Sequence, residues 1–232
     1  MVDEKSLIRE SELQNYLLVE GSDDAHIFKC LLDYFQIPFE FRGQSRYNQP
    51  PKGLIKIVDK EGIDALLDTL EVELIANREG RFGIVLDADT NLEARWQSVR
   101  NRLIPFGYSA VPSTPFPQGT IVVENERPVV GIWLMPDNKV PGMMEDFISF
   151  LVPPDDLLWP LTVDVLTRVI ETDCRFPLVH KSKALIHTWL AWQRKPGTPT
   201  GRAITSHYLD ANAPHAQQLM AWIRQLFNLE SA

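Results

Sequence analysis

The stretch Asn15–Phe35, "NYLLVEGSDDAHIFKCLLDYF", begins with a short apolar run and reaches a carboxylate at Glu20, directly before a glycine. An apolar run of this length, bounded by Gly21, is typical of a buried parallel strand. Ser22 or Asp23 is suited to cap the next helix, whose apolar residues recur at helical spacing. A strand that ends in an acid and turns into a helix predicts the opening unit of an α/β domain.

A second apolar run, "RFGIVLDADTN" (81–91), also ends in acids, Asp87 and Asp89. Strand-like and helix-like segments alternate around it, and a hairpin is predicted from the apolar runs 121–123 and 129–135. This alternation predicts an α/β fold with a mostly parallel central sheet flanked by helices. We expect this domain to span residues 1–150. The remaining segment is predicted to be helical, which gives a C-terminal extension, 151–232, packed on the same domain.

Composition sets limits on the function. The chain has 232 residues, 44% of them hydrophobic and 23% charged, as expected for a globular protein. Its net charge of −8 argues against a broadly basic surface that coats nucleic acid. The N-terminal segment is charged and lacks the apolar core of a signal peptide, and no apolar run approaches membrane-spanning length. We therefore expect a cytoplasmic protein without a membrane partner.

The acids at the strand ends are the main functional signal. Ligand sites in open parallel sheets lie beyond the carboxyl ends of the strands. If the two strands are neighbours, Glu20, Asp87 and Asp89 meet at one edge, where Asp87 and Asp89 point the same way because side chains alternate along a strand. Carboxylates crowded together repel each other unless a cation binds or one is protonated. Hard oxygen ligands suit Mg²⁺ or Mn²⁺. The alternative is that each acid only ends its strand, or that Asp89 caps the following helix.

These motifs resemble a known family. "LLVEGSDDAHIF" resembles the first motif of the Toprim domain, with Asp24 at the acidic position after the glutamate-glycine pair, and "IVLDADTN" resembles its Asp-x-Asp motif. The whole chain, including "GIWLMPDNKVPGMMEDFI" and "KALIHTWLAW", resembles stand-alone Toprim proteins like the overcoming-lysogenization-defect (OLD) nucleases. The resemblance implies a Toprim-like fold. It also implies that Glu20 is a general acid/base or metal ligand and that Asp87 and Asp89 bind Mg²⁺.

Further residues are candidates for supporting roles. The resemblance to OLD-like nucleases implies that Glu145 in "PGMMED" binds a second metal ion, with Asp137 and Asp146 as weaker candidates. Acids at a helix start also simply complement the helix dipole. Lys183 is a candidate for stabilising a transition-state oxyanion, although a surface lysine that begins a helix is the alternative.

A basic loop adds one possible phosphate contact. "RGQSRYN" carries Arg42 and Arg46 near Tyr47, and these arginines are candidates for contacting a phosphate backbone. The alternative is a solvated loop. The chain contains no "GxxxxGK[ST]" phosphate loop, and no zinc-ribbon or ATPase segment is evident. It is therefore not a complete topoisomerase, primase or ATP-driven nuclease.

Three functions remain open at this stage. The first is Mg²⁺-dependent, nuclease-like processing of nucleic-acid phosphodiesters, with DNA and RNA unresolved. The second is a non-catalytic Toprim module that binds nucleic acid or a protein partner supplied in trans. The third is a metal-dependent phosphatase or nucleotide-processing enzyme. Whether the chain is an enzyme is therefore not decided by its sequence.

Overall fold

The computed structural model describes residues 14–229. The charged N-terminal segment and the last three residues of the predicted extension lie outside these described residues. The strands are β1 (Asn15–Val19), β2 (Phe39–Phe41), β3 (Gln44–Ser45), β4 (Ile55–Asp59), β5 (Arg81–Asp87), β6 (Thr120–Val122) and β7 (Val129–Met135). The helices are α2 (Ser22–Tyr34), α3 (Ile63–Ala76), α4 (Leu92–Leu103), α5 (Met144–Ser149), α6 (Leu158–Asp173), α7 (Lys181–Ala191), α8 (Thr200–Thr205) and α9 (Pro214–Leu226), with a 3-10 turn at Leu178–His180.

The strands form one mostly parallel sheet, as predicted. Its order is β3-β2-β4-β1-β5-β7-β6. The five inner strands are parallel, and the two edge strands β3 and β6 are antiparallel to their neighbours. β1 lies in the middle, paired with β4 on one side and with β5 on the other. The chain is therefore an α/β protein with a mixed but mainly parallel sheet.

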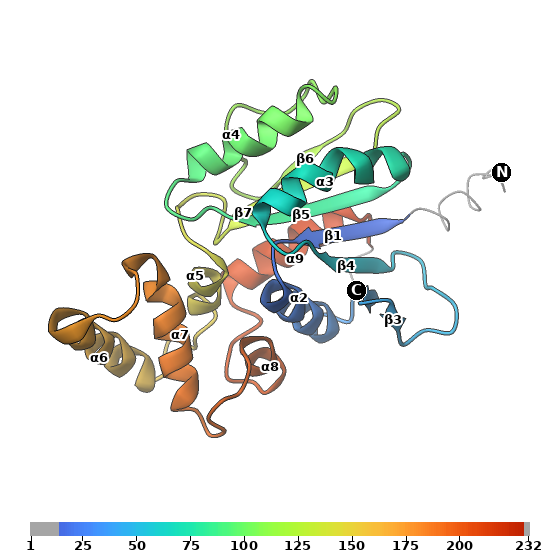
Figure 1. The fold of residues 1–232 in the computed structure, drawn as a ribbon. Coiled ribbons are helices and arrows are strands. Elements are labelled where there is room, and N and C mark those ends of the chain that lie inside the picture. Colours follow the sequence, from blue (N-terminus) through green and yellow to red (C-terminus); the bar gives the residue numbers. More distant parts are fainter. Residues whose placement is uncertain (1–13, 230–232) are drawn as a thin grey trace.

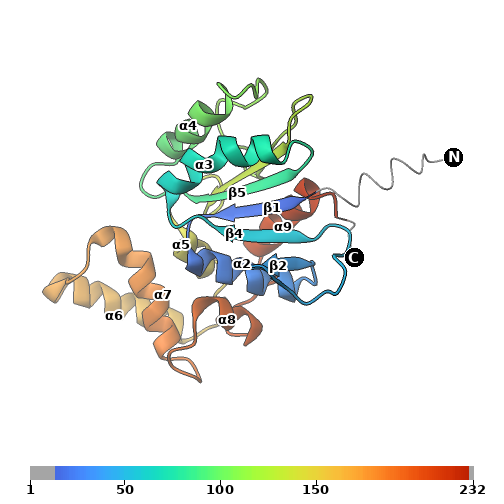
Figure 2. The same ribbon diagram turned by 45° about the vertical axis from the view of Figure 1, so that its right-hand side comes forward.

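Helices cover both faces of the sheet (Figures 1 and 2). α3 and α4 lie on one face, and α2 and α9 lie on the other. Side chains of β1 alternate between the two cores, since Leu17 and Val19 belong to the α2 side and Leu18 to the α3 side. Alternation of this kind is what the period of two along a strand requires when both faces are buried.

Helix α9 completes the core on the α2 side. A glycine in each of two neighbouring strands, Gly83 and Gly131, lies at the same register position. A Cβ on Gly131 would stand 2.5 Å from Cδ2 of Leu226, and one on Gly83 would stand 3.2 Å from the same atom. Because these glycines have no side chain, Leu226 and Trp222 of α9 reach the sheet surface and are fully buried there.

The remaining helices lie beyond the carboxyl ends of the strands. α5 follows β7, and α6 and α7 project from the body as a pair of helices (Figure 1). α8 packs closely on α2, where a Cβ on Gly201 would stand 2.8 Å from the carbonyl oxygen of His26. Helix α8 begins inside "PGTPTG", which the sequence predicts to be a linker, and the two-residue strand β3 lies inside a predicted loop. No helix within residues 14–229 is long and apolar enough to span a membrane.

The predicted cap of α2 is wrong, and the alternative that Asp89 caps the next helix does not hold either. Helix α2 is capped by Gly21 and not by Ser22 or Asp23, and the Gly21 amide donates a 3.0 Å hydrogen bond to the Asp24 carboxylate. Helix α4 is capped by Asn91, whose side-chain oxygen accepts a 2.9 Å hydrogen bond from the Ala94 amide. The position of each cap depends on where the chain leaves the strand, which local residue preferences do not determine.

Candidate functional site

Two acids meet at the carboxyl edge of the sheet. Glu20 directly follows β1, and Asp87 is the last residue of the neighbouring strand β5. The backbone amide of Asp87 donates a 2.7 Å hydrogen bond to Oε1 of Glu20. Oδ1 of Asp87 in turn accepts a 2.9 Å hydrogen bond from the amide of Met144, the first residue of α5. These contacts join β1, β5 and α5 at one point.

This point is where ligand sites occur in open α/β sheets. After β1 the chain continues into α2 on one face, and after β5 it continues into α4 on the opposite face (Figure 2). Connections that leave two neighbouring parallel strands toward opposite faces open a crevice at the carboxyl ends of those strands. Glu20 and Asp87 therefore stand where the topology itself provides a binding position.

Asp24 and Glu145 join these two acids. Burial and, to a smaller extent, the nearby charges of Asp24, Glu20 and Glu145 together raise the pKa of Asp87 to about 9. The pKa of Asp24 is raised to about 7, mainly by burial and further by the charges of Glu20 and Glu145, while the hydrogen bond from the Gly21 amide opposes the rise. Burial also raises the pKa of Glu20, although the Asp87 amide and Arg95 oppose this. We call Glu20, Asp24, Asp87 and Glu145 the acid cluster.

Asp89 does not continue the extended strand as the sequence predicts. The strand ends at Asp87, and Asp89 adopts a left-handed backbone conformation with φ of +51°. Its carboxylate pairs with the guanidinium of Arg95, whose Nε also donates a 2.8 Å hydrogen bond to the carbonyl oxygen of Asp87. The argument that alternation along a strand points Asp87 and Asp89 the same way does not apply, because alternation holds only while the backbone stays extended. Asp89 is close enough to Glu20 and Asp87 for its charge to raise the pKa of both, but its own side chain is half exposed.

Lysine and serine residues of α7 contact the acids of α5. Nζ of Lys183 lies 3.7 Å from Oε1 of Glu145, and this lysine side chain is half exposed. Asp146 accepts hydrogen bonds from the Met143 amide, at 2.8 Å, and from the hydroxyl of Ser182. Asp146 thus caps α5 and ties it to α7, while Glu145 of the same helix lies near enough to raise the pKa of Asp24 and Asp87.

The other predicted residues lie apart from the cluster. Asp137 is buried, and its carboxylate accepts hydrogen bonds from the amides of Lys139 at 3.0 Å and Val140 at 3.2 Å, which holds the turn after β7. Arg42 and Arg46 lie on the α2 side of β2. Arg42 donates hydrogen bonds to the Ser22 hydroxyl at 2.7 Å and to the Asp59 carboxylate at 3.4 Å.

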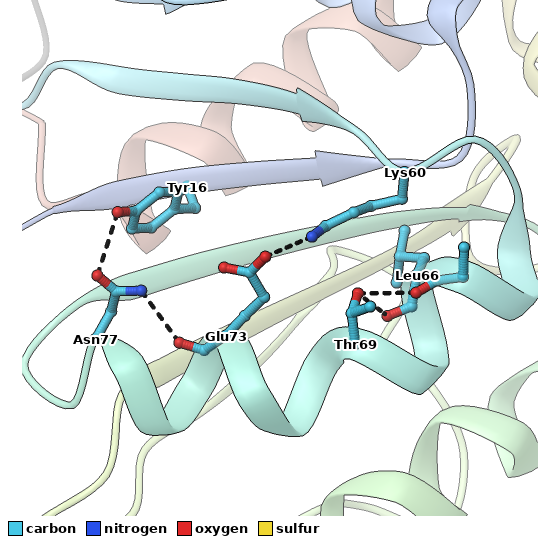
Figure 3. Close-up of polar contacts among 7 residues, drawn as sticks. Tyr16, Lys60, Leu66, Thr69, Glu73 and Asn77 are labelled. Carbon is cyan, nitrogen blue, oxygen red and sulfur yellow. Dashed lines mark hydrogen bonds and ion pairs between the residues drawn. The ribbon is translucent and has the colours of Figure 1, made fainter.

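Positive charge near the acid cluster comes from Arg95 and Lys183. Lys60 also follows a strand at this edge, directly after β4, and its amide donates a 3.1 Å hydrogen bond to the carbonyl oxygen of Val19. Its ammonium group, however, turns to the α3 face and lies 2.5 Å from a carboxylate oxygen of Glu73 (Figure 3). Lys60 is therefore engaged away from the cluster.

The donor atoms fit a hard divalent cation in their chemistry. All four members of the cluster are carboxylates, which suit Mg²⁺ or Mn²⁺. In residues 14–229, Oε2 of Glu20 and Oδ2 of Asp87 accept no hydrogen bond and are available as ligands. No three histidine, cysteine, aspartate or glutamate side chains in this part of the chain are arranged to hold a metal ion as they stand. Enclosing a cation would require the carboxylates to move closer together.

Two residues of the site are not found by sequence reasoning. Arg95 lies one turn into α4 and reaches back to Asp89, and Ser182 begins α7 and contacts Asp146. An arginine in the first turns of a helix and a serine near a helix start are common and give no signal of their own. Both contacts depend on how the helices pack.

Comparison with known proteins gives two matches. No curated protein matches the chain. Among solved structures, the chain is similar to the C-terminal region of the Xanthomonas campestris pv. campestris OLD protein, with 12% identity over 94% of each chain. The TM-score of 0.39 does not show that the two proteins share a fold. A family model described as "Protein of unknown function (DUF3226)" matches residues 14–228, so the chain belongs to this family.

Proposed function

We propose that the protein is a Toprim-like, metal-dependent enzyme that processes nucleic-acid phosphodiesters. The observation that carries this proposal is the convergence of Glu20, Asp24, Asp87 and Glu145 from β1, α2, β5 and α5. Four carboxylates in a partly buried space repel one another, which is unfavourable for folding unless they serve a ligand. A hard divalent cation relieves this repulsion and supports chemistry at phosphate.

Within this proposal the metal ion would be held by Glu20 and Asp87, with Glu145 and Asp89 as further ligands. When bound, Mg²⁺ or Mn²⁺ supplies charge that stabilises the developing negative charge on phosphate. Glu20 is assigned the proton transfer, because its Oε1 is fixed by the Asp87 amide and its pKa is raised by burial. Lys183 is assigned the role of stabilising the transition-state oxyanion. Its ammonium group lies beside Glu145, and its side chain is half exposed, so a substrate can reach it.

The decisive experiment is a cleavage assay on the purified chain. Supercoiled plasmid, linear duplex DNA, single-stranded DNA and RNA are each incubated with Mg²⁺, Mn²⁺ or EDTA. We expect metal-dependent products with at least one of these substrates and none with the Glu20→Gln variant purified in the same way. The Asp68→Asn variant, which changes an exposed carboxylate on α3, is the matched control and should cleave normally. Equal activity in wild type and Glu20→Gln would mark a contaminant and reject the proposal.

One observation favours a second candidate, a non-catalytic module that binds nucleic acid or a protein partner. Asp89 is paired with Arg95, and within the described residues no three acids are arranged to hold a metal. A protein whose acids are held in this way has no preformed metal centre. Nucleic-acid binding in EDTA, combined with no cleavage in any metal, would select this candidate.

A further inference from the structure

A pocket of about 420 Å³ lies between α2 and the β2–β3 hairpin, on the same face of the sheet as α9. Its walls are formed by Phe39 and Phe41 of β2, by Lys29 and Asp33 of α2, and by Arg46 beyond β3. Both aromatic rings are only half-buried. The pocket therefore combines aromatic rings with charged groups, and its volume lies in the range of small-molecule sites.

Cations stack on the aromatic rings throughout this region. Nζ of Lys29 lies 5.3 Å from the ring centroid of Phe41, and Cζ of Arg42 lies 5.2 Å from the same centroid. Cζ of Arg46 lies 5.6 Å from the centroid of Phe39 and 5.4 Å from that of Tyr47. Three cations above aromatic faces form a local concentration of positive charge on a chain whose net charge is −8.

The ion pairs that these cations form with carboxylates are weak, so a phosphate group can take the place of the carboxylate. Arg46 pairs with Asp33 at 2.8 Å, but both side chains are about half exposed, at 54% and 46%. Arg42 pairs with Asp59 at only 3.4 Å. Within residues 14–229, Lys29 forms no ion pair. Its ammonium group lies over the Phe41 ring. Exposed pairs of this kind add little stability, so a phosphate group can replace the carboxylates at small cost.

Arg42, which lies over the Phe41 ring of the pocket, connects this region with the start of α2 beside Glu20. Arg42 donates a 2.7 Å hydrogen bond to the hydroxyl of Ser22, which is two residues after Glu20. β2 is separated from β1 by β4 alone, which corresponds to about 10 Å across the sheet. A polymer whose backbone crosses Arg42 therefore reaches Glu20 within a short step along the same edge.

We propose that this pocket holds an unpaired nucleotide of a single-stranded nucleic acid, whose backbone continues over Arg42 to the acid cluster. The base displaces the cationic side chains from the faces of Phe41 and Phe39 and stacks there, and Lys29, Arg42 and Arg46 then contact the phosphates. Stacking requires a base with an open face, which a duplex covers with its neighbouring base pairs, so a single strand is the preferred ligand. This inference rests on the proposed function, because it assigns the polymer that the acid cluster acts on.

The test measures binding separately from cleavage. A fluorescein-labelled oligothymidylate and an oligouridylate are titrated with the full chain in EDTA at low salt, and fluorescence anisotropy is recorded. We expect Phe41→Leu, which keeps an apolar side chain and removes the ring, to weaken binding about tenfold. Lys29→Ala and Arg46→Ala should each weaken binding and reduce its salt dependence, because each removes one phosphate contact.

Arg102→Ala provides the matched control. Arg102 is an exposed arginine of α4, 51% exposed and paired with Asp68, on the opposite face of the sheet. This variant should bind the labelled single strands as tightly as the wild type does. An unlabelled duplex of the same length should displace the single strands from the wild type only poorly. The inference is overturned if the wild type binds no single strand, if the pocket variants bind as well as the wild type, or if the duplex competes equally.

The outcomes also separate this inference from the proposed function. Binding that is sensitive to Phe41 and Arg46, without cleavage in any metal, keeps the pocket and rejects the catalytic proposal. Metal-dependent cleavage with unchanged KM and kcat in all pocket variants keeps the catalytic proposal and rejects the pocket.

Discussion

The backbone amide of Asp87 donates a 2.7 Å hydrogen bond to Oε1 of Glu20, which joins two acids 67 positions apart in the chain. The bond fixes the direction of the Glu20 side chain at the end of its strand. Glu20 therefore has a structural role, as the acceptor of this hydrogen bond, in addition to its proposed role in the reaction. Substitutions at Glu20 must therefore be chosen so that the hydrogen bond survives.

Glu20→Gln should abolish turnover and leave folding and substrate binding nearly unchanged. The amide oxygen still accepts from the Asp87 amide, but the side chain cannot exchange a proton or carry the charge. Glu20→Ala is the contrasting variant, since it leaves the Asp87 amide without its partner and should cost about 1–3 kcal/mol of unfolding free energy. Cleavage assays and thermal unfolding of both variants check this. Full activity in Glu20→Gln would contradict this role of Glu20 and, as in the cleavage assay above, would reject the proposed function.

Asp87→Asn should stabilise the metal-free protein at neutral and alkaline pH. In the folded state the pKa of Asp87 is raised to about 9, mainly by burial, from 3.8 in the unfolded chain. Protonated Asp87 contributes fully to the stability of the fold below about pH 4. This contribution is lost as pH rises through about 9, because the unfolded chain releases the Asp87 proton at a lower pH than the folded chain does. Asparagine has no such penalty and keeps the oxygen that accepts from the Met144 amide.

We therefore expect the Asp87→Asn variant to melt about 2–4 °C above the wild type at pH 8. The difference should shrink toward pH 4. Thermal unfolding in EDTA between pH 4 and 9 measures it, with the exposed Asp68→Asn as the control for loss of one negative charge. A variant that melts below the wild type at pH 8 would contradict the raised pKa of Asp87.

Mg²⁺ or Mn²⁺ should raise the melting temperature of the wild type by mass action, by an amount that grows with metal concentration. The Glu20→Gln and Asp87→Asn double variant should lose most of this shift. Asp89→Asn should lose less, since the Asp89 carboxylate is already neutralised by Arg95. A metal-induced shift of equal size in wild type and double variant would show that the cation binds elsewhere.

Lys183→Ala should lower kcat of the proposed cleavage by at least about tenfold with little change in stability. Its ammonium group is 3.7 Å from Glu145 and half exposed, so its loss removes charge near the substrate without opening the core. Lys181→Ala, an exposed lysine two residues earlier on the same helix, is the matched control and should be silent. Equal effects of the two variants would indicate only a general contribution of positive charge.

Gly131→Ala should destabilise the fold by about 1–3 kcal/mol because a Cβ there would stand 2.5 Å from Leu226 of α9. Gly21→Ala is the control, since its Cβ would meet only a carboxylate oxygen of Asp24 at 3.7 Å. Urea unfolding gives the free energies, and hydrogen exchange in α9 locates the effect. Unchanged exchange in α9 would mean that Leu226 repacks without cost.

The parts of the fold that the sequence predicts are those decided locally. The apolar runs of β1 and β5 and the acids that follow them are visible in the sequence, and the parallel sheet then brings Glu20 and Asp87 to one edge. The direction of Asp89 is not predictable in this way, because it depends on a left-handed turn and on an arginine that reaches back from α4. Helix α8 is missed because its proline- and glycine-rich start is typical of a linker, while its packing on α2 is a tertiary contact.

The position of α9 has a consequence for how the chain folds during synthesis. The sheet strands are complete by Met135, yet the sheet surface around Gly83 and Gly131 is covered by Trp222, Leu226 and Phe227, near the end of the described residues. A nascent chain on the ribosome would therefore carry an uncovered apolar surface while about 80 further residues are translated, which takes several seconds. Until α9 arrives, that surface is open to chaperones and to aggregation, so conditions that slow translation after Met135 should lower the soluble yield.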